Sequence, residues 1–230
     1  MFTMGTPLWG GGGADPFAGN VLSLMHFDGA DGSTTFTDQV PGRVWTRNGT
    51  PTISTAQSKF GGSSYSGALS SYLSASSPGS EWLLSGDYSI ECWMLCNDNG
   101  GSAGILSIGT NTAEGTIFSI EASGTAMSHR VGSNTTRSQG DGAGSLYGRW
   151  VHVFAGRSGT TTYTAVSGIM RIDVGDAAHA NGSVTNVKVG SQALIGGGSP
   201  YLYLDEFRVT KGVCRHTASF TPPAAPYPNP

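Results

Sequence analysis

Two adjacent acids, Asp205 and Glu206, interrupt an apolar segment near the end of the sequence, YLYLDEFRV (201–209). Paired carboxylates are the usual means of general acid–base and glycosidic chemistry, provided that both reach the same atoms. Successive side chains of a regular strand point to opposite faces, so these two acids cannot act as a pair without a local irregularity.

The phase of this segment indicates such an irregularity. Leu202 and Leu204 occupy even positions, whereas Phe207 and Val209 occupy odd ones. A register change between the two pairs fits a β-bulge, which adds a residue to the strand and re-aims a side chain. We therefore predict a bulge at Asp205–Glu206.

The other residue types that carry chemistry form no catalytic or zinc motif. The five histidines, at positions 26, 129, 152, 179 and 216, have no H-E-x-x-H or clustered spacing, and the sequence contains no G-x-S-x-G elbow or P-loop. Cys92 and Cys96 lie on one predicted strand, roughly 13 Å apart, whereas a disulfide needs Cα atoms within about 7 Å. We expect buried free thiols in a protein made in a reducing cytosol.

The composition excludes several classes of partner. Charged residues make up 12% of the chain and the net charge is −3. The Lys and Arg residues are scattered, so no basic stripe predicts nucleic-acid binding. No apolar run approaches the ~18–20 residues that span a bilayer, and residues 1–17 lack the basic and apolar regions of a secretory signal. We expect no nucleic-acid partner and no membrane insertion.

The elements that must position any site are short strands. The 36 glycines and abundant Ser and Thr disfavour helices and suit turns. Turn signals such as Asn48-Gly49 separate apolar runs, several of which alternate with period two. The predicted strands are 21–27, 88–96, 103–109, 116–122, 149–156, 161–166, 169–174 and 187–196. Only 80–86 hints at a helix, so we predict antiparallel sheets in one domain.

The two ends of the chain differ from this pattern. Residues 1–20 are too poor in apolar side chains for a core, and they form either a disordered leader or an arm that docks on a neighbouring subunit. The candidate anchors of the arm are Phe2, Leu8, Trp9 and Phe17. Residues 211–230 are rich in proline, which fixes φ and lacks an N–H, so we expect an extended tail packed along the domain.

Three side chains near this end carry further expectations. We expect Phe220 and Tyr227 to plug the tail onto the domain. Arg208, just before the tail, is expected to face solvent.

Five segments, in order, resemble the concanavalin A-like lectin/glucanase superfamily. They are LMHFDGADGSTTFTD (24–38), ISTAQSKFGGSS (53–64), GDYSIECWM (86–94), WVHVFAGR (150–157) and YLDEFRVTKGVCRHTASFTPPAAPYP (203–228). More narrowly, they are similar to laminin-G-like domains of bacteriophage virion proteins. The resemblance implies an all-β, concanavalin A-like jelly-roll sandwich of two antiparallel sheets at 21–210, with the first and last strands adjacent.

The glucanase branch of this superfamily places three acids at alternating positions of one strand, in the pattern E-x-D-x-E, so that acid and nucleophile share a face. None of the five glutamates here, at 81, 91, 114, 121 and 206, is followed two residues later by an acid. We therefore expect no enzymatic activity. A polysaccharide-degrading enzyme that depends on Glu91 or Glu121 is the alternative.

Relatives in the superfamily also hold calcium at the rim of the sandwich. Ca²⁺ prefers six to eight oxygen ligands, and the resemblance points to Asp28, Asp31 and Asp38, with Asp205 brought close by the last strand. A structural Ca²⁺ there would join the two ends of the domain. The alternative is that Asp28 and Asp31 make Asx-turns and that Asp205 accepts backbone N–H groups.

Sugar sites on such sandwiches pair an aromatic ring with a few amides and acids. The candidate glycan platforms are Trp45, Trp82 and Tyr72.

These observations predict a non-catalytic phage virion structural protein: a capsid decoration, head-fibre or tail-associated subunit. The arm would fix it to capsid or tail proteins of the same virion, and the lectin-like sandwich would serve surface attachment or adhesion to a host-surface or environmental glycan. We expect a homo-oligomer on the virion surface, made in the host cytoplasm. A stand-alone carbohydrate-binding lectin is a further alternative.

Overall fold

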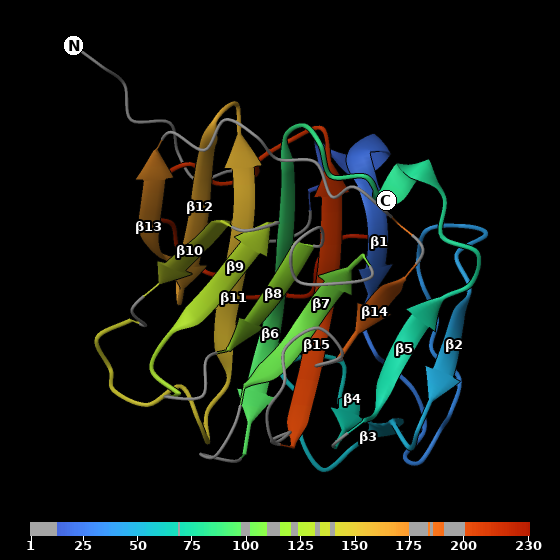
Figure 1. Ribbon diagram of the computed structural model, residues 1–230. Coiled ribbons are helices and arrows are strands. Elements are labelled where there is room, and N and C mark those ends of the chain that lie inside the picture. Colours follow the sequence, from blue (N-terminus) through green and yellow to red (C-terminus); the bar gives the residue numbers. More distant parts are fainter. Residues whose placement is uncertain are drawn as a thin grey trace.

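The protein folds into two antiparallel β-sheets that pack face to face (Figure 1). The computed structural model describes residues 13–68, 70–97, 102–109, 116–120, 124–131, 134–138, 141–174, 184, 186–190 and 201–230. In this part of the chain the only helices are two short 3₁₀ turns, η1 (Ala18–Asn20) and η2 (Ser80–Trp82). The fold is therefore all-β, as predicted.

The eight strands of sheet A run in the order β13-β12-β11-β6-β15-β4-β3, and β1 also pairs with β15. Their bounds are β1 (Val21–Met25), β3 (Thr52–Ser54), β4 (Ser64–Gly67), β6 (Tyr88–Cys96), β11 (Val151–Ser158), β12 (Thr161–Val166), β13 (Ile169–Val174) and β15 (Leu202–Lys211). The first and last strands are thus neighbours, as the resemblance implied.

The seven strands of sheet B run in the order β10-β9-β8-β7-β14-β5-β2 and lie in front of sheet A in Figure 1. Their bounds are β2 (Trp45–Asn48), β5 (Tyr72–Ala75), β7 (Ala103–Ile108), β8 (Thr116–Ile120), β9 (Met127–Val131), β10 (Asn134–Ser138) and β14 (Val187–Val189). All the pairings in both sheets are antiparallel, as expected where no helical crossover joins the strands.

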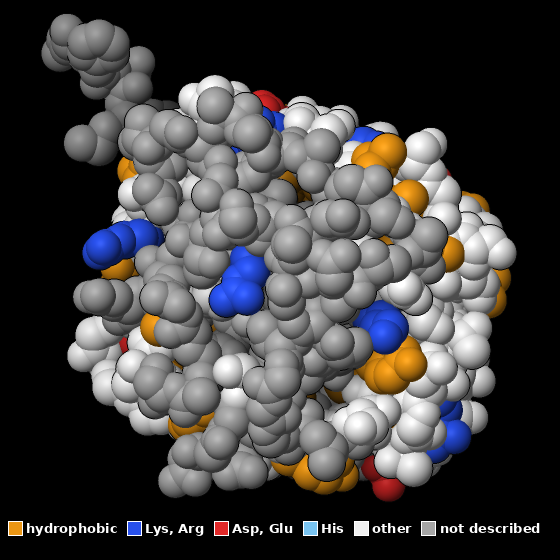
Figure 2. All heavy atoms as spheres, in the orientation of Figure 1, with side chains coloured by type: hydrophobic (Ala, Val, Ile, Leu, Met, Phe, Trp, Pro, Cys, Tyr) orange, Lys and Arg blue, Asp and Glu red, His pale blue; other side chains and the backbone are white. Residues whose placement is uncertain are grey.

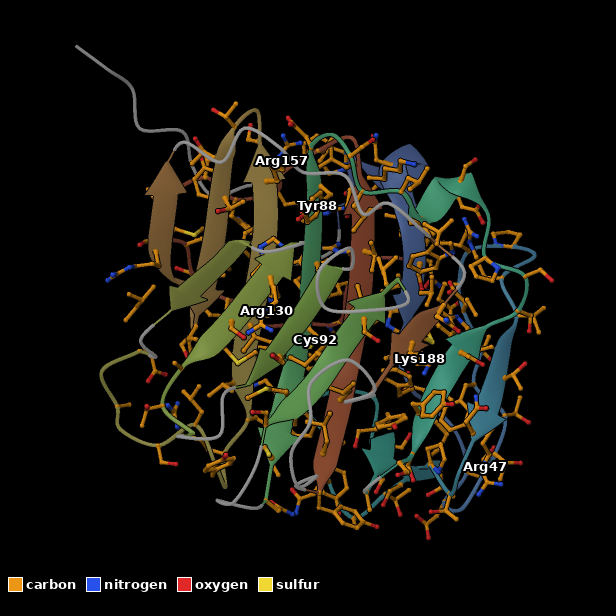
Figure 3. The ribbon with its side chains drawn as sticks, in the orientation of Figure 1. Arg47, Tyr88, Cys92, Arg130, Arg157 and Lys188 are labelled. Carbon is orange, nitrogen blue, oxygen red and sulfur yellow. The ribbon has the colours of Figure 1, made fainter. Side chains whose placement is uncertain are left out.

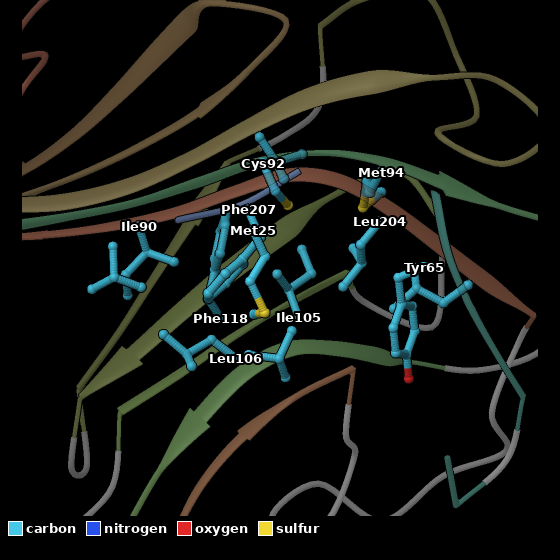
Figure 4. Packing of buried hydrophobic residues seen from close by; sticks show 14 of the residues in the cluster. Met25, Tyr65, Ile90, Cys92, Met94, Ile105, Leu106, Phe118, Leu204 and Phe207 are labelled. Carbon is cyan, nitrogen blue, oxygen red and sulfur yellow. The ribbon is translucent and has the colours of Figure 1, made fainter. Parts of the chain in front are cut away.

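The core lies between the sheets and follows the alternation of the sequence. In β6, Ile90, Cys92 and Met94 point into it, and they meet side chains of sheet B such as Ile105 and Phe118 (Figure 4). Each large apolar side chain buried in this way contributes roughly 1.5–3 kcal/mol. The opposite, outer face of β6 carries Glu91 and Trp93. The charged side chain of this strand therefore lies on the outer face of sheet A.

The predicted bulge is confirmed. The pairing of β15 with β6 shifts register between Asp205 and Arg208, and Glu206 has a φ of 54°. Leu204 and Phe207 consequently both face the core despite their opposite parity. The same strand pairs with β4 before the bulge and with β1 after it.

The predicted strands agree with the observed ones to within a few residues at most of their ends. The longest disagreement is in the segment 187–196, where β14 ends at Val189 and residues 191–196 lie outside the described part. The helical hint at 80–86 corresponds to the single turn η2. Cys92 and Cys96 are both buried and free, as predicted. None of the described helices is long and apolar enough to cross a membrane.

Candidate functional site

Glu91, one of the two glutamates on which the enzymatic alternative depends, is buried in an ion pair on the outer face of sheet A. It is fully buried, and Arg208 of the neighbouring strand β15 donates to its Oε1 from Nε at 3.1 Å and from Nη2 at 2.8 Å. Cross-strand pairing puts the two residues directly opposite each other. The expectation that Arg208 faces solvent was therefore wrong, because it covers a carboxylate that the strand alternation sends to this face.

A second acid and a second arginine extend the pair into a network. Asp15, from the segment before the first strand, accepts from Arg208 Nη1 at 3.3 Å. It also accepts from Arg215 at 3.0 and 2.7 Å in a bidentate arrangement. Such planar, two-fold pairing is the strongest geometry available to arginine and a carboxylate. The network ties residues before β1 and after β15 to the middle of the sheet.

The C-terminal tail covers the network on the outer face of sheet A. Tyr227 is buried, its hydroxyl donates to Glu91 Oε2 at 3.3 Å, and the same hydroxyl lies 2.8 Å from His152 Nε2. The Arg208 guanidinium lies 3.7 Å from the centroid of the Tyr227 ring, a cation–π distance. Phe220 of the same tail packs edge to face on His152 and Phe154 of β11, with ring centroids 5.6 and 5.8 Å apart. Both aromatic residues predicted as plugs thus lie against the sheet.

Electrostatics keep Glu91 ionised. Burial works against its charge, but Arg208 and the other cations around it outweigh burial and hold its pKa at about 2. Burial, in contrast, dominates at His152 and lowers its pKa to about 4, so this ring is neutral at pH 7. A general acid for glycoside cleavage needs a raised pKa and access to substrate. Glu91 has neither, and Glu121 lies outside the described residues.

The bulge residue Glu206 anchors the tail at a second point. Its Oε2 accepts from the Tyr227 backbone N–H at 2.7 Å, and its Oε1 lies 2.8 Å from His26 Nδ1. The other nitrogen of His26 lies 2.8 Å from Asn229 Oδ1. Burial opposes a charge on His26, but the hydrogen bond and charge of Glu206 outweigh it and raise the pKa of His26 to about 9. The bulge therefore re-aims an acid toward a structural contact.

Of the predicted calcium ligands, Asp38 is fully engaged by the protein. Its carboxylate accepts from Ser23 Oγ at 2.6 Å, Leu24 N at 3.1 Å, Val40 N at 2.9 Å and Trp45 Nε1 at 2.9 Å. A metal would have to replace these four donors. Asp38 thus serves as a hydrogen-bond centre that joins β1, β2 and the loop between them.

Of the remaining three candidate ligands, Asp28 and Asp205 lie close enough for their charges to interact. Asp205 accepts from the backbone N–H groups of Lys59 and Phe60 at 2.7 and 3.0 Å, and its other oxygen has no partner in the described part of the chain. Burial, with the charges of Glu206 and Asp28, raises the pKa of Asp205 to about 7 despite these bonds. Asp31 accepts from Thr55 N at 2.9 Å.

Within the described residues, no three His, Cys, Asp or Glu side chains form a group that could hold a metal. Calcium binding at the rim of the sandwich stays a prediction.

Two of the three predicted glycan platforms lie inside the molecule. Trp82 is fully buried and Trp45 almost so, with their rings edge to face at 5.8 Å. The prediction that these rings bind sugar is corrected: a sugar cannot reach either ring, because both pack under the edge of sheet B.

Tyr72 is the predicted platform that reaches the surface. It is half-buried on the outer face of sheet B, next to Lys188 of β14, whose Nζ lies 4.6 Å from the centroid of its ring. Asn48 is paired with Tyr72 across β2 and β5, and its amide donates to Ser74 Oγ at 2.9 Å. We call Asn48, Tyr72, Ser74 and Lys188 the Tyr72 surface. A ring with hydroxyl, amide and ammonium groups around it is chemically suited to a sugar.

The predicted arm is described only from residue 13 onward. Phe2, Leu8 and Trp9 lie outside the described residues. Phe17, predicted to anchor the arm on a neighbouring subunit, is half-buried and lies under Arg215 of its own chain, 5.3 Å from ring centroid to guanidinium. Asp15 in the same segment is buried.

The fold is similar to that of toxin binding domains. The binding domain of botulinum neurotoxin serotype G matches with a TM-score of 0.64 and 10% identity, over 85% of this chain and 49% of that chain. The serotype C1 binding domain matches with a TM-score of 0.59 and 10% identity, over 86% and 50%. A structure of botulinum neurotoxin type C, whose cell entry depends on two ganglioside molecules, matches with a TM-score of 0.60 and 9% identity, over 86% and 49%.

These similarities extend to the fold and not to sequence. No protein-family model and no curated protein matches the sequence. The chain spans about half the length of the solved structures that it matches. At 9–10% identity they support a jelly-roll sandwich fold. The narrower resemblance to laminin-G-like phage domains stays a prediction.

Proposed function

We propose that the protein is a non-catalytic attachment module that binds glycan on the outer face of sheet B. The observation that carries the proposal is the difference between the two outer faces. Segments near the two ends of the described chain cover Glu91 and Glu206 on sheet A, where Tyr227 and Asp15 are buried. On sheet B, the Tyr72 surface combines an accessible aromatic ring with polar groups.

The known proteins of similar fold support this proposal. Botulinum neurotoxin type C depends on gangliosides for cell entry, and a related binding domain has been solved in complex with SialylT. The ion pair of Glu91 with Arg208 supports the non-catalytic part of the proposal. Among the described side chains, Glu91 is the glutamate on which the enzymatic alternative depends, and this ion pair occupies it.

A glycan array tests the proposal with a matched pair of variants. Tyr72→Ala should lose at least about tenfold in binding to any glycan that the wild type retains. Tyr163→Ala is the control, since Tyr163 is also half-buried but lies on β12 of sheet A. No wild-type binding above background, or equal losses in both variants, would remove glycan binding from the proposal.

We further propose that the module belongs to a phage virion, as a decoration, head-fibre or tail-associated subunit. The segment before Gly13 would fix it to capsid or tail proteins. Mass spectrometry of purified particles should detect the protein in a fixed ratio to the capsid subunit. Its absence from particles would favour the stand-alone lectin.

Calcium is a separate proposal for the rim near Asp28 and Asp205. Added Ca²⁺ should raise the melting temperature of the wild type, and Asp28→Asn should remove that increase. An unchanged melting temperature in calcium and in chelator would count against a bound cation.

A further inference from the structure

Sheet B carries basic residues and no acid. Its seven strands contain four bases, Arg47, Arg130, Arg137 and Lys188, and no Asp or Glu. The strands of sheet A contain four acids, Glu91, Asp173, Asp205 and Glu206, and also four bases, Arg157, Arg171, Arg208 and Lys211. The strands of sheet B therefore carry a net positive charge in a molecule whose net charge is −3. Figure 2 shows basic side chains within this face and acidic ones toward its border.

Strand register puts two of these bases on one row of the outer face. Ser74 pairs with Lys188, Lys188 with Ser107, Ser107 with Ile117, and Ile117 with Arg130. Cross-strand partners share a face, so Lys188 and Arg130 point to the same side, three strand spacings or roughly 14 Å apart. Figure 3 labels both residues on this sheet.

Lys188 is the cation best placed for a ligand. It has no ion-pair partner among the described residues, and its ammonium lies over the Tyr72 ring. A cation–π contact at an accessible site is weak, so the ammonium can turn toward an anion and leave the ring to a sugar. Asn48 and Ser74 beside it are uncharged. No described acid on these strands would repel an anionic ligand.

We infer that the ligand of the Tyr72 surface is an acidic glycan, with its carboxylate or sulfate group against Lys188 and its sugar ring against Tyr72. This inference rests on the proposed function and adds the chemical class of the ligand. Charge complementarity favours it over a neutral glycan, since a neutral sugar would gain nothing from the ammonium.

The test compares polymers that differ in charge. Binding of the full chain is measured by biolayer interferometry to immobilised polygalacturonate, dextran sulfate and unmodified dextran, with duplex DNA as a further polyanion. We expect binding to one or both acidic polysaccharides, at least tenfold weaker binding to dextran and DNA, and weakening as salt increases. Preference for polygalacturonate or for dextran sulfate identifies the acidic group as carboxylate or sulfate.

A pair of charge variants locates the site. Lys188→Gln should weaken binding at least tenfold, and Arg171→Gln, which removes an exposed cation on sheet A, should leave it unchanged. Retained binding in Lys188→Gln, or equally tight binding to DNA, overturns the inference. Equal binding to dextran also overturns it but leaves the proposed glycan function intact, whereas no binding to any polysaccharide removes both.

Discussion

Arg208 directs two nitrogens at a single oxygen of Glu91, at 3.1 and 2.8 Å, in a position where neither side chain reaches solvent. The pair lies at the centre of sheet A, and Asp15 and Tyr227 close it from the two ends of the described chain. Removing such a pair from water costs much free energy, and the attraction between the charges, with the hydrogen bonds of their further partners, offsets this cost. We interpret the pair as the contact that holds the segments before β1 and after β15 on sheet A.

Removing one partner should therefore be severe. We expect Arg208→Ala to lower the free energy of unfolding by about 3–5 kcal/mol, because it leaves Glu91 buried without its counter-ion. Urea denaturation measures the change. Arg171→Ala, at an exposed position of β13, is the control and should change stability by less than about 0.5 kcal/mol. A loss below about 1 kcal/mol in Arg208→Ala would show that the network does not hold the two end segments on sheet A.

The tail should detach in steps as Tyr227 is cut back. Tyr227→Phe removes the hydroxyl contacts with Glu91 and His152 and should cost about 1–2 kcal/mol. Tyr227→Ala also empties the ring's site and should cost about 3–5 kcal/mol. Hydrogen exchange of residues 221–230 should accelerate in the alanine variant well before global unfolding. Equal exchange in both variants and the wild type would mean that other contacts hold the tail.

Stability should fall in alkaline solution because of His26. Its pKa in the folded protein is raised to about 9, so the stabilisation is complete below its ordinary pKa of 6.5 and is lost as the pH rises through 9. The shift corresponds to about 3–4 kcal/mol, which screening by solvent at this partly exposed group reduces to roughly 2–3 kcal/mol. Chemical denaturation between pH 6 and 10 should show this decline in the wild type. In His26→Gln the curve should be nearly flat between about pH 8 and 9, because Asp205, whose pKa is raised to about 7, contributes its own decline at lower pH. An unchanged decline in that range would assign it to another group.

Asp38 should matter for stability with or without calcium. Asp38→Ala leaves the Trp45 Nε1, Leu24 N and Ser23 hydroxyl donors without their acceptor, and we expect a loss of about 3 kcal/mol. Thermal unfolding in calcium and in chelator checks the cause. The same loss in both solutions supports a hydrogen-bond role, and a loss confined to calcium would restore Asp38 as a ligand.

Much of the fold could be predicted because its signals are local. Alternation located β6, β11, β12 and β13, and the parity change between Leu204 and Phe207 was enough to locate the bulge. The outward position of Tyr72 also follows from its apolar neighbour Leu73, which is fully buried.

The candidate sites were less predictable because their partners are remote. Asp15 and Arg208 are separated by 193 residues, and no pattern around either one indicates the other. Without that partner, an arginine after two acids is typical of a solvated strand end. Trp45 and Trp82 were misplaced for a similar reason, since they bury each other across separate segments.

The place of β15 within sheet A has a consequence for how the protein is made. This strand pairs with β6, β4 and β1, yet its residues, Leu202–Lys211, come late in the chain. A nascent chain emerging from the ribosome therefore holds three strands that lack a shared neighbour until this last of the described strands has been synthesised. Contacts so far apart in sequence slow folding and expose unpaired edges in the meantime. Stalled or C-terminally shortened chains should accordingly aggregate during expression, even though most of the strands are already present.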